Sequence, residues 1–122
     1  MTQVEVVDTS EKLALFSEHW RPKIVASLND YHVKLVKLQG QFTWHAHQNT
    51  DELFLVLAGT MHISMRDREV SLSPGQLFVV PKGVEHRPWS EEECSVMLLE
   101  PAGLVNTGEA GGEQTAPNDV WI

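Results

Sequence analysis

The chain has 122 residues, enough for one domain, and its 42% hydrophobic and 21% charged residues are typical of a folded globular protein rather than a disordered chain. Seventeen Asp and Glu outweigh nine Lys and Arg, for a formal charge of −8. This charge disfavours nucleic acid and anionic membranes as partners, because both attract clustered positive side chains. The apolar run 53–58 is too short to span a bilayer, and residues 1–15 lack the features of a secretory signal. We therefore expect a cytoplasmic domain.

The single cysteine, Cys94, excludes an intrachain disulfide and is interpreted as a small apolar strand residue.

One short helix is predicted near the N-terminus. Asp8 can cap its first amides, and Glu11, three residues later, can reach back to complete a capping box. Residues 13–16 supply an apolar face, and Pro22 lies beyond the expected end of the helix. We expect residues 1–22 to form an N-terminal arm that contains this helix.

Residues 23–100 are predicted to form the main domain, built from short β-strands. The expected strands are separated by turns that contain Gly and Pro, and they cover residues 33–38, 52–57, 61–65, 70–72, 77–80 and 94–100. Over 33–38 the apolar alternation changes phase, which indicates either a bulge or a strand that is buried on both faces. Strands of this length and spacing favour an all-β sandwich or barrel.

Residues 101–122 have the Gly-, Thr- and Asn-rich composition of a flexible tail, but they end in Val120-Trp121-Ile122. Large apolar residues at a terminus favour docking on the barrel or on a partner subunit, with simple disorder as the alternative. We expect this C-terminal tail to be docked.

Three histidines and a glutamate form a candidate metal site. His45 and His47 lie two residues apart, so in an extended segment both rings point to one side. Glu52 directly precedes the apolar run 53–57, so its charge enters a buried strand and needs a partner, and His86 follows the turn at residues 81–83. Each residue alone has an ordinary explanation, as a surface histidine or a solvated strand end. Together they are the ligand types that a divalent transition metal prefers.

The spacing of these residues resembles two motifs of the cupin superfamily. Gly40, His45, His47, Glu52 and Gly59 resemble the first motif, with an entry loop one residue shorter than usual. Gly75, the turn Pro81-Lys82-Gly83 and His86 resemble the second motif. Ser90 stands where the family commonly has Asn. The motifs cover residues 40–86, and flanking strands extend the likeness over residues 31–100.

This resemblance implies an all-β, double-stranded β-helix, or jelly-roll barrel, preceded by the short N-terminal helix. It also implies that His45, His47, Glu52 and His86 hold one divalent transition metal ion inside one end of the barrel. Ligand chemistry narrows the metal to iron, manganese, zinc, nickel, cobalt or copper without choosing among them. Small members of the family often carry a mannose-6-phosphate isomerase-like label, and such a reaction would need Arg or Lys near the metal.

The sequence gives weaker indications of which residues surround the metal site. His19, His32 and His62 are not assigned to the metal. Lys34 or Lys37 could face inward, and Glu85 and Tyr31 are weak candidates for an acid or base. An apolar lining is expected from aromatic and aliphatic residues, for which packing in the core is the ordinary alternative: Phe42, Trp44, Phe54, Val56, Met61, Met65, Phe78 and Trp89.

The favoured function is a metal-dependent enzyme, an isomerase, epimerase or dioxygenase, acting on a small oxygenated metabolite. The alternatives are a non-catalytic module that binds a metal or small molecule, and a barrel that has lost its metal. The resemblance also implies a homodimer formed by sheet packing, for which the outer side chains of Leu53, Leu55 and Leu57 are candidates. No nucleic acid or membrane partner is expected.

Overall fold

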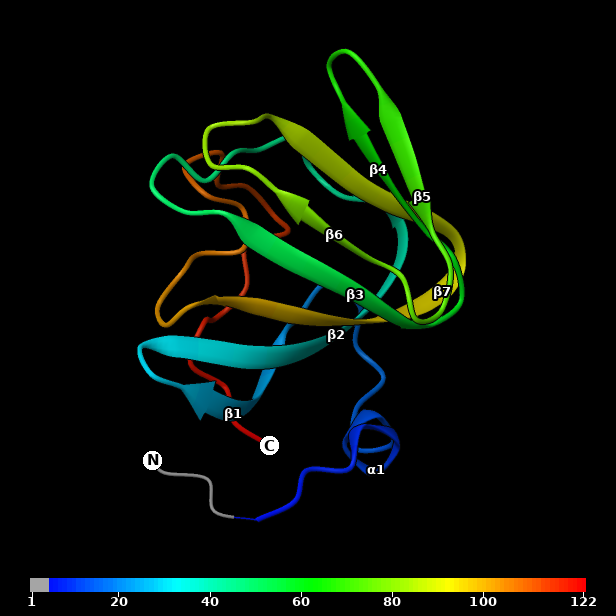
Figure 1. Ribbon diagram of the computed structural model, residues 1–122, viewed down its shortest axis with the longest axis vertical. Coiled ribbons are helices and arrows are strands. Elements are labelled where there is room, and N and C mark those ends of the chain that lie inside the picture. The colour runs from blue at the N-terminus through cyan, green and yellow to red at the C-terminus, as the bar shows by residue number, and fades with distance from the viewer. Residues whose placement is uncertain (1–4) are drawn as a thin grey trace.

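The computed structural model describes residues 5–122, and its regular secondary structure is almost entirely β-strand, as the sequence predicted (Figure 1). One short helix, α1 (Thr9–Leu13), precedes the strands. The strands are β1 (Lys23–Leu28), β2 (Tyr31–Gln41), β3 (Glu52–Ala58), β4 (Met61–Met65), β5 (Glu69–Leu72), β6 (Leu77–Val80) and β7 (His86–Pro101). None of the helical structure in residues 5–122 is long and apolar enough to cross a membrane.

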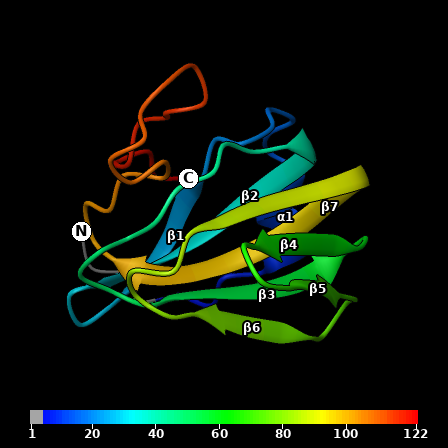
Figure 2. The ribbon, with the colours of Figure 1, turned by 90° about the horizontal axis from the view of Figure 1, so that it is seen from above.

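The strands pair in antiparallel fashion in the order β1-β2-β7-β3-β6, and β4 pairs with both β5 and β7. Strand β7 joins the two parts of the fold. Its beginning, from His86 to Trp89, pairs with β4, whereas its later part pairs with β2 and β3. Figure 2 shows β4 and β5 facing the long sheet, so that the strands enclose a jelly-roll barrel. The sequence had indicated only the later part of β7, because Pro88 and the acidic residues 91–93 obscure its earlier part.

The interior of the barrel is formed by alternate residues of facing strands. On β3, Glu52, Phe54 and Val56 are buried, whereas the intervening leucines are only partly buried. On β2, Leu35 and Val36 are both buried, so this part of the strand is covered on both faces. The β1–β2 pairing also has a register shift between Ile24 and Ala26, opposite Lys34 and Val33, so both burial on two faces and a bulge accompany the phase change. Cys94 is fully buried in the core, as expected, and burial raises the pKa of its thiol to about 11.

The N-terminal helix is capped as predicted but packs less than expected. The side chain of Asp8 accepts hydrogen bonds from the backbone N–H groups of Ser10 and Glu11, at 3.0 and 3.2 Å. The described hydrogen bonds include none from Glu11 back to Asp8, so the capping box is not formed. The expected apolar face is also largely unused: no residue of α1 is buried, and Leu15 is 66% exposed.

The C-terminal tail runs back along the barrel. The backbone of Ile24 in β1 donates a hydrogen bond to the Val120 carbonyl at 2.7 Å and accepts one from Ile122 at 3.1 Å. Trp121 lies between these contacts and forms a bridge to Ile24. The tail, drawn in orange and red in Figure 2, rises along one side of the barrel before it returns to β1.

Candidate metal site

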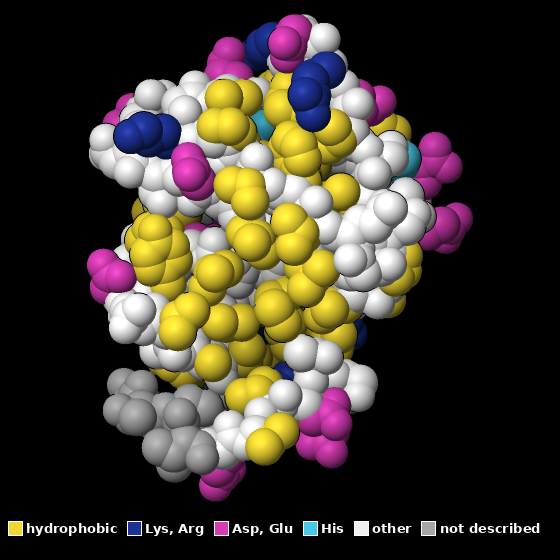
Figure 3. Space-filling view, viewed as in Figure 1, with side chains coloured by type: hydrophobic (Ala, Val, Ile, Leu, Met, Phe, Trp, Pro, Cys, Tyr) yellow, Lys and Arg dark blue, Asp and Glu magenta, His cyan; other side chains and the backbone are white. Residues whose placement is uncertain are grey.

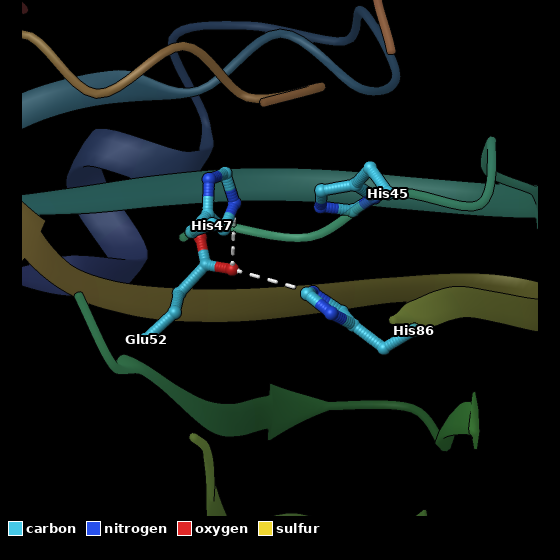
Figure 4. Close-up of side chains that lie close together, drawn as sticks. All are labelled: His45, His47, Glu52 and His86. Atoms are coloured by element: carbon cyan, nitrogen blue, oxygen red, sulfur yellow. Dashed lines mark ion pairs between the residues drawn. The ribbon is translucent and has the colours of Figure 1, made fainter. Parts of the chain in front are cut away.

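The structure brings all four predicted site residues together at one end of the barrel (Figure 4). His45 and His47 lie in the segment that connects β2 to β3, Glu52 is the first residue of β3, and His86 is the first residue of β7. Two backbone hydrogen bonds between His45 and His86, at 2.9 and 3.0 Å, hold the two motifs side by side. The site is therefore fixed by backbone pairing as well as by its side chains.

The donor atoms of the four residues converge. One possible ligand atom from each lies within 4.8 Å of the others, and all four residues are buried. The Glu52 Oε1 atom is 3.3 Å from His47 Nε2 and 3.6 Å from His86 Nε2. Figure 4 shows the three rings and the carboxylate arranged around a common centre. Such a set could hold a metal ion, because several ligands at bonding distance from one ion must lie within a few ångströms of each other.

Hydrogen bonds on the far side of two rings orient them toward this centre. The Nδ1 atoms of His45 and His86 lie 3.0 and 2.9 Å from the carbonyl oxygens of Thr43 and Val84, respectively. A carbonyl oxygen only accepts, so each Nδ1 carries the proton and leaves the Nε2 lone pair free to bind a cation.

Several atoms at the centre lack hydrogen-bond partners. Nε2 of His47, Nε2 of His86 and Oε1 of Glu52 are buried and unpaired, since the close contacts among them do not have hydrogen-bond geometry. Buried polar atoms are normally hydrogen-bonded, so three orphaned acceptors or donors at one point indicate a missing partner. A divalent cation fits this donor set of imidazole nitrogen and carboxylate oxygen.

The ionisation of the site suits a cation. Burial, together with the charge of His86, lowers the pKa of His45 to about 4, so its ring is neutral near pH 7. Burial of Glu52 favours its neutral form, but the neighbouring His47 and His86 outweigh this effect and hold its pKa below the usual range. Neutral imidazoles and an ionised carboxylate are the forms that bind metal.

The turn before His86 is shaped as the sequence suggested. Gly83 has a φ of +80°, which favours glycine, and its N–H donates to the His47 carbonyl at 2.9 Å. The N–H of Lys82 donates to the Asp51 carboxylate at 2.9 Å. The turn of the second motif is thus bonded directly to the segment of the first.

A buried pair adjoins Glu52 on the interior face of the sheet. Lys34 points inward, and its Nζ atom donates a hydrogen bond to Oε2 of Glu100 at 3.0 Å. Burial raises the pKa of Glu100, and the charge of Glu52 raises it further, whereas Lys34 opposes the shift. Lys37 faces the other way and donates to the Phe16 carbonyl at 2.7 Å. The sequence analysis missed Glu100, although it follows Val96 and Leu98 on the same face of β7.

A cavity of about 40 Å³ lies next to the site and reaches His45 and Glu52. Its inner wall consists of buried barrel residues: Val36, Leu38, Phe54, Met61 and Leu98. Its remaining wall comes from residues outside the barrel centre: Trp20, Pro22, Phe42, Pro88 and Asn106. The chamber is lined mostly by apolar side chains with a few polar groups, as small-molecule pockets are.

The lining differs in part from the sequence expectation. Phe42, Phe54 and Met61 line the cavity as expected, whereas Trp44, Met65, Phe78 and Trp89 do not, and Val56 packs in the core. The Trp44 ring instead lies beneath Arg66, and Trp89 stacks on His62. Trp20 and Asn106 were missed because they come from segments before and after the barrel strands, whose approach no local pattern reveals.

The remaining candidates lie apart from the four-residue group. His19 pairs with Glu93 at 2.7 Å, His32 packs against the edge of Trp121, and His62 stacks on Trp89. The suggested acid–base residues are not at the cavity either. Glu85 is exposed and pairs with Arg66, and Tyr31 is exposed at the start of β2.

Comparisons with known proteins agree with this architecture. Residues 32–100, more than half of the chain, match the family model described as "Cupin domain". Uncharacterized protein YdbB of Bacillus subtilis (strain 168) is 36% identical over 81 residues, which are 66% of this chain and 66% of that protein, just under two thirds of either length. A cupin-2 domain containing protein from Shewanella frigidimarina NCIMB 400 is 48% identical, with a TM-score of 0.78 over 79% of this chain and 94% of that one. Protein NMB1881 from Neisseria meningitidis is 35% identical, with a TM-score of 0.74 over 80% and 99% of the respective chains. The chain therefore belongs to the cupin-domain family.

Proposed function

We propose that the protein is a metal-dependent enzyme that acts on a small oxygenated molecule. The ligands of its single divalent transition metal ion are His45, His47, Glu52 and His86. The observation that carries this proposal is the group of buried, unpaired donor atoms beside a cavity that reaches two of the four residues. When bound, a metal of this type supplies a Lewis acid that polarises an oxygen of the substrate.

The roles of the chain's own residues follow from their contacts. The carbonyls of Thr43 and Val84 keep the rings of His45 and His86 oriented, and the backbone pairing between these histidines keeps the two motifs in register. The apolar walls exclude water from the bound molecule, which strengthens polar interactions at the site. Orientation of the substrate would thus come from the metal ligands and from the shape of the cavity.

The reaction class is best sought among isomerisations, epimerisations and dioxygenations. A sugar phosphate is disfavoured as substrate, because none of the cavity-lining residues is Lys or Arg. One observation also favours a non-catalytic binding module: apart from His45 and Glu52, the residues lining the cavity include no acid or base.

Metal analysis tests the ligand assignment. The purified protein, loaded separately with iron, manganese and zinc, is expected to retain about one ion per chain after gel filtration. Glu52→Gln and His86→Ala should lose most of the metal, because each removes one of four ligands, whereas His62→Ala serves as the matched control. Unchanged metal content in the ligand variants would end the assignment.

Turnover then separates an enzyme from a binding module. The metal-loaded protein is screened on diketones, catechols and sugar phosphates, with the Glu52→Gln variant as the blank. Metal-dependent product formation supports the enzyme. Tight binding of one of these compounds without turnover under any metal supports the module.

We also propose that a second copy of the chain covers the outer face of β3 and β6. In the sheet register, Leu53 pairs with Val79, and Leu55 pairs with Leu77. Leu77 and Val79 are 55% and 41% exposed. Figure 3 shows hydrophobic side chains gathered over the part of the molecule where these strands lie in Figure 1. An exposed apolar sheet face of this kind supports a symmetric dimer by sheet packing.

A further inference from the structure

The cavity beside the metal-site residues is apolar apart from the site itself. Nine of its twelve lining residues are aliphatic, aromatic or proline, and the other three are His45, Glu52 and Asn106. A ligand in this chamber therefore meets hydrocarbon on most of its surface. Burying a polar or charged group there without a partner is costly.

The third polar residue, Asn106, is already engaged. Its amide nitrogen donates to the carbonyl of Gln114 at 3.0 Å and lies 3.5 Å from that of Trp20, and its amide oxygen accepts from the Ala116 N–H at 3.0 Å. These bonds tie the tail to the segment before β1 and leave the side chain little capacity for a ligand. Polar recognition inside the cavity is thus confined to the His45 and Glu52 side.

Three positive side chains near the site, those of Lys34, Arg66 and Arg87, do not line the cavity. Lys34 is paired with Glu100. Arg66 and Arg87 lie over the ring of Trp44, 3.9 and 5.3 Å from its centre, and neither lines the cavity. An anionic group in the apolar part of the chamber would therefore meet no Lys or Arg side chain among the residues that line it.

Trp20 is held in the cavity wall by an unusual backbone conformation. Its φ is +62°, a left-handed conformation that bulky residues rarely adopt. Its N–H donates to the Lys37 carbonyl at 2.9 Å, and its indole N–H donates to the Gln39 carbonyl at 3.0 Å. Its ring stacks on Phe42 with centres 4.7 Å apart. Strained conformations of this kind persist where the surroundings over-determine them, and they are frequent at ligand sites.

We propose that this cavity selects a small, uncharged and largely apolar molecule that presents one or two oxygen atoms to the metal, and that Trp20 sets the upper limit on its size. This inference rests on the proposed metal site. It adds the substrate class: ketones, diketones or phenols of few heavy atoms rather than carboxylates or phosphates. Trp20 acts as a specificity-determining wall, not as a group that exchanges protons.

A matched pair of chelating probes tests the charge preference. Pentane-2,4-dione and malonate both offer two oxygens across a three-carbon unit, but malonate carries charged ends in place of methyl groups. The full chain is loaded with Co²⁺, and the visible spectrum of the bound ion is followed during titration, with metal retention checked by gel filtration. The dione is expected to reach half-saturation at a concentration at least about tenfold lower than malonate. The dione releases one proton to solvent when it chelates as the enolate and keeps its charge on the oxygens that face the metal, whereas malonate places a charged carboxylate oxygen against the apolar wall at each end.

The outcomes separate this inference from the proposed function. Failure of the protein to retain Co²⁺ overturns the metal site and this inference with it. Retention of Co²⁺ with equal or tighter binding of malonate, or with no response to the dione, overturns the substrate class and leaves the metal site standing.

Cavity enlargement tests the role of Trp20. In Trp20→Ala, 1-phenylbutane-1,3-dione should gain at least about tenfold in affinity relative to pentane-2,4-dione, because the wall no longer excludes the phenyl group. Trp89→Ala is the control, since Trp89 stacks on His62 outside the cavity. An unchanged preference in a Trp20→Ala protein that still retains Co²⁺ refutes the size limit. If that variant does not fold, Trp20→Phe, which removes less of the wall, must show a smaller shift in the same direction.

Discussion

The side-chain nitrogen of Lys34 lies 3.0 Å from a carboxylate oxygen of Glu100 inside the barrel, where the two side chains are only 2% and 3% exposed. Burial raises the pKa of Glu100, the charge of Glu52 raises it further, and Lys34 opposes the shift, so the pair is electrostatically coupled to one of the four site residues. A buried pair adds little to stability when compared with apolar residues, but the loss of one member leaves the other without a partner.

Removal of Lys34 alone should therefore be more harmful than removal of both partners. Lys34→Met is expected to lower the free energy of unfolding by about 3 kcal/mol, whereas Lys34→Met combined with Glu100→Leu should recover most of that loss. Urea unfolding of the metal-free proteins measures both. Lys37→Met is the control, because Lys37 lies on the opposite face of β2. If the losses in unfolding free energy of the two single variants simply added in the double variant, the proposed coupling between Lys34 and Glu100 would be contradicted.

Stability of the metal-free protein should fall in mild acid. The pKa of His45 is about 4 in the folded protein, chiefly because of burial, against about 6.5 for an unperturbed histidine. Between these values the unfolded chain binds the proton and the folded chain does not, so stability decreases as the pH falls from about 6.5 to about 4. The loss in the free energy of unfolding that is due to His45 approaches about 3 kcal/mol below pH 4.

Urea unfolding at pH 7, 5.5 and 4 checks this dependence. The difference between the wild-type protein and His45→Asn isolates the histidine, because the asparagine does not titrate in this range. A difference that stays constant with pH would show that His45 is not held neutral.

The tail should depend on the absence of a side chain at Gly108. Gly108 has a φ of +58°, and a Cβ atom there would overlap the Ala46 carbonyl oxygen, beside His47. Gly108→Ala is expected to lower the free energy of unfolding by about 1–3 kcal/mol more than Gly111→Ala, because overpacking adds to the backbone strain. Gly111 is a matched control, since it has a similar φ of +65° and no atom within 4 Å of its added Cβ.

Limited proteolysis provides a second readout of the same change. Gly108→Ala should expose the tail to cleavage earlier than Gly111→Ala does. Equal cleavage and equal stability of the two variants would mean that the close approach to Ala46 does not hold the tail.

The apolar outer face predicts the oligomeric state. Light scattering after gel filtration should give about twice the chain mass of 13.7 kDa for the wild-type protein. Leu77→Lys combined with Val79→Lys should give the monomer, because the charges would be buried against the same face of the partner. Leu28→Lys is the control, because Leu28 is also 55% exposed but lies on β1. A monomeric wild-type protein would contradict the proposed dimer.

Local patterns in the sequence indicated an all-β sandwich or barrel and a candidate metal site, and the resemblance to the cupin motifs narrowed the fold to a jelly-roll barrel. The alternation of apolar and polar residues along β4 indicates a strand, and Gly59 and Gly75 indicate turns. Both signals involve residues that are close in the chain, so they can be interpreted without tertiary information. Glu52 at the start of an apolar strand likewise indicates a buried charge, which requires a partner. His45 and His47 share a short segment, and only His86 had to be brought in from another strand.

The tertiary structure alone decided what surrounds that group. Trp20, Asn106 and Glu100 reach the site or its cavity from the arm, the tail and the end of β7, and their positions depend on how distant segments pack. Lys34 and Lys37 looked equivalent in the sequence until pairing with β7 placed one of them inside the barrel. The physical reason is that strand and turn preferences act between near neighbours, whereas burial and cavity shape are set by contacts between residues far apart in the chain.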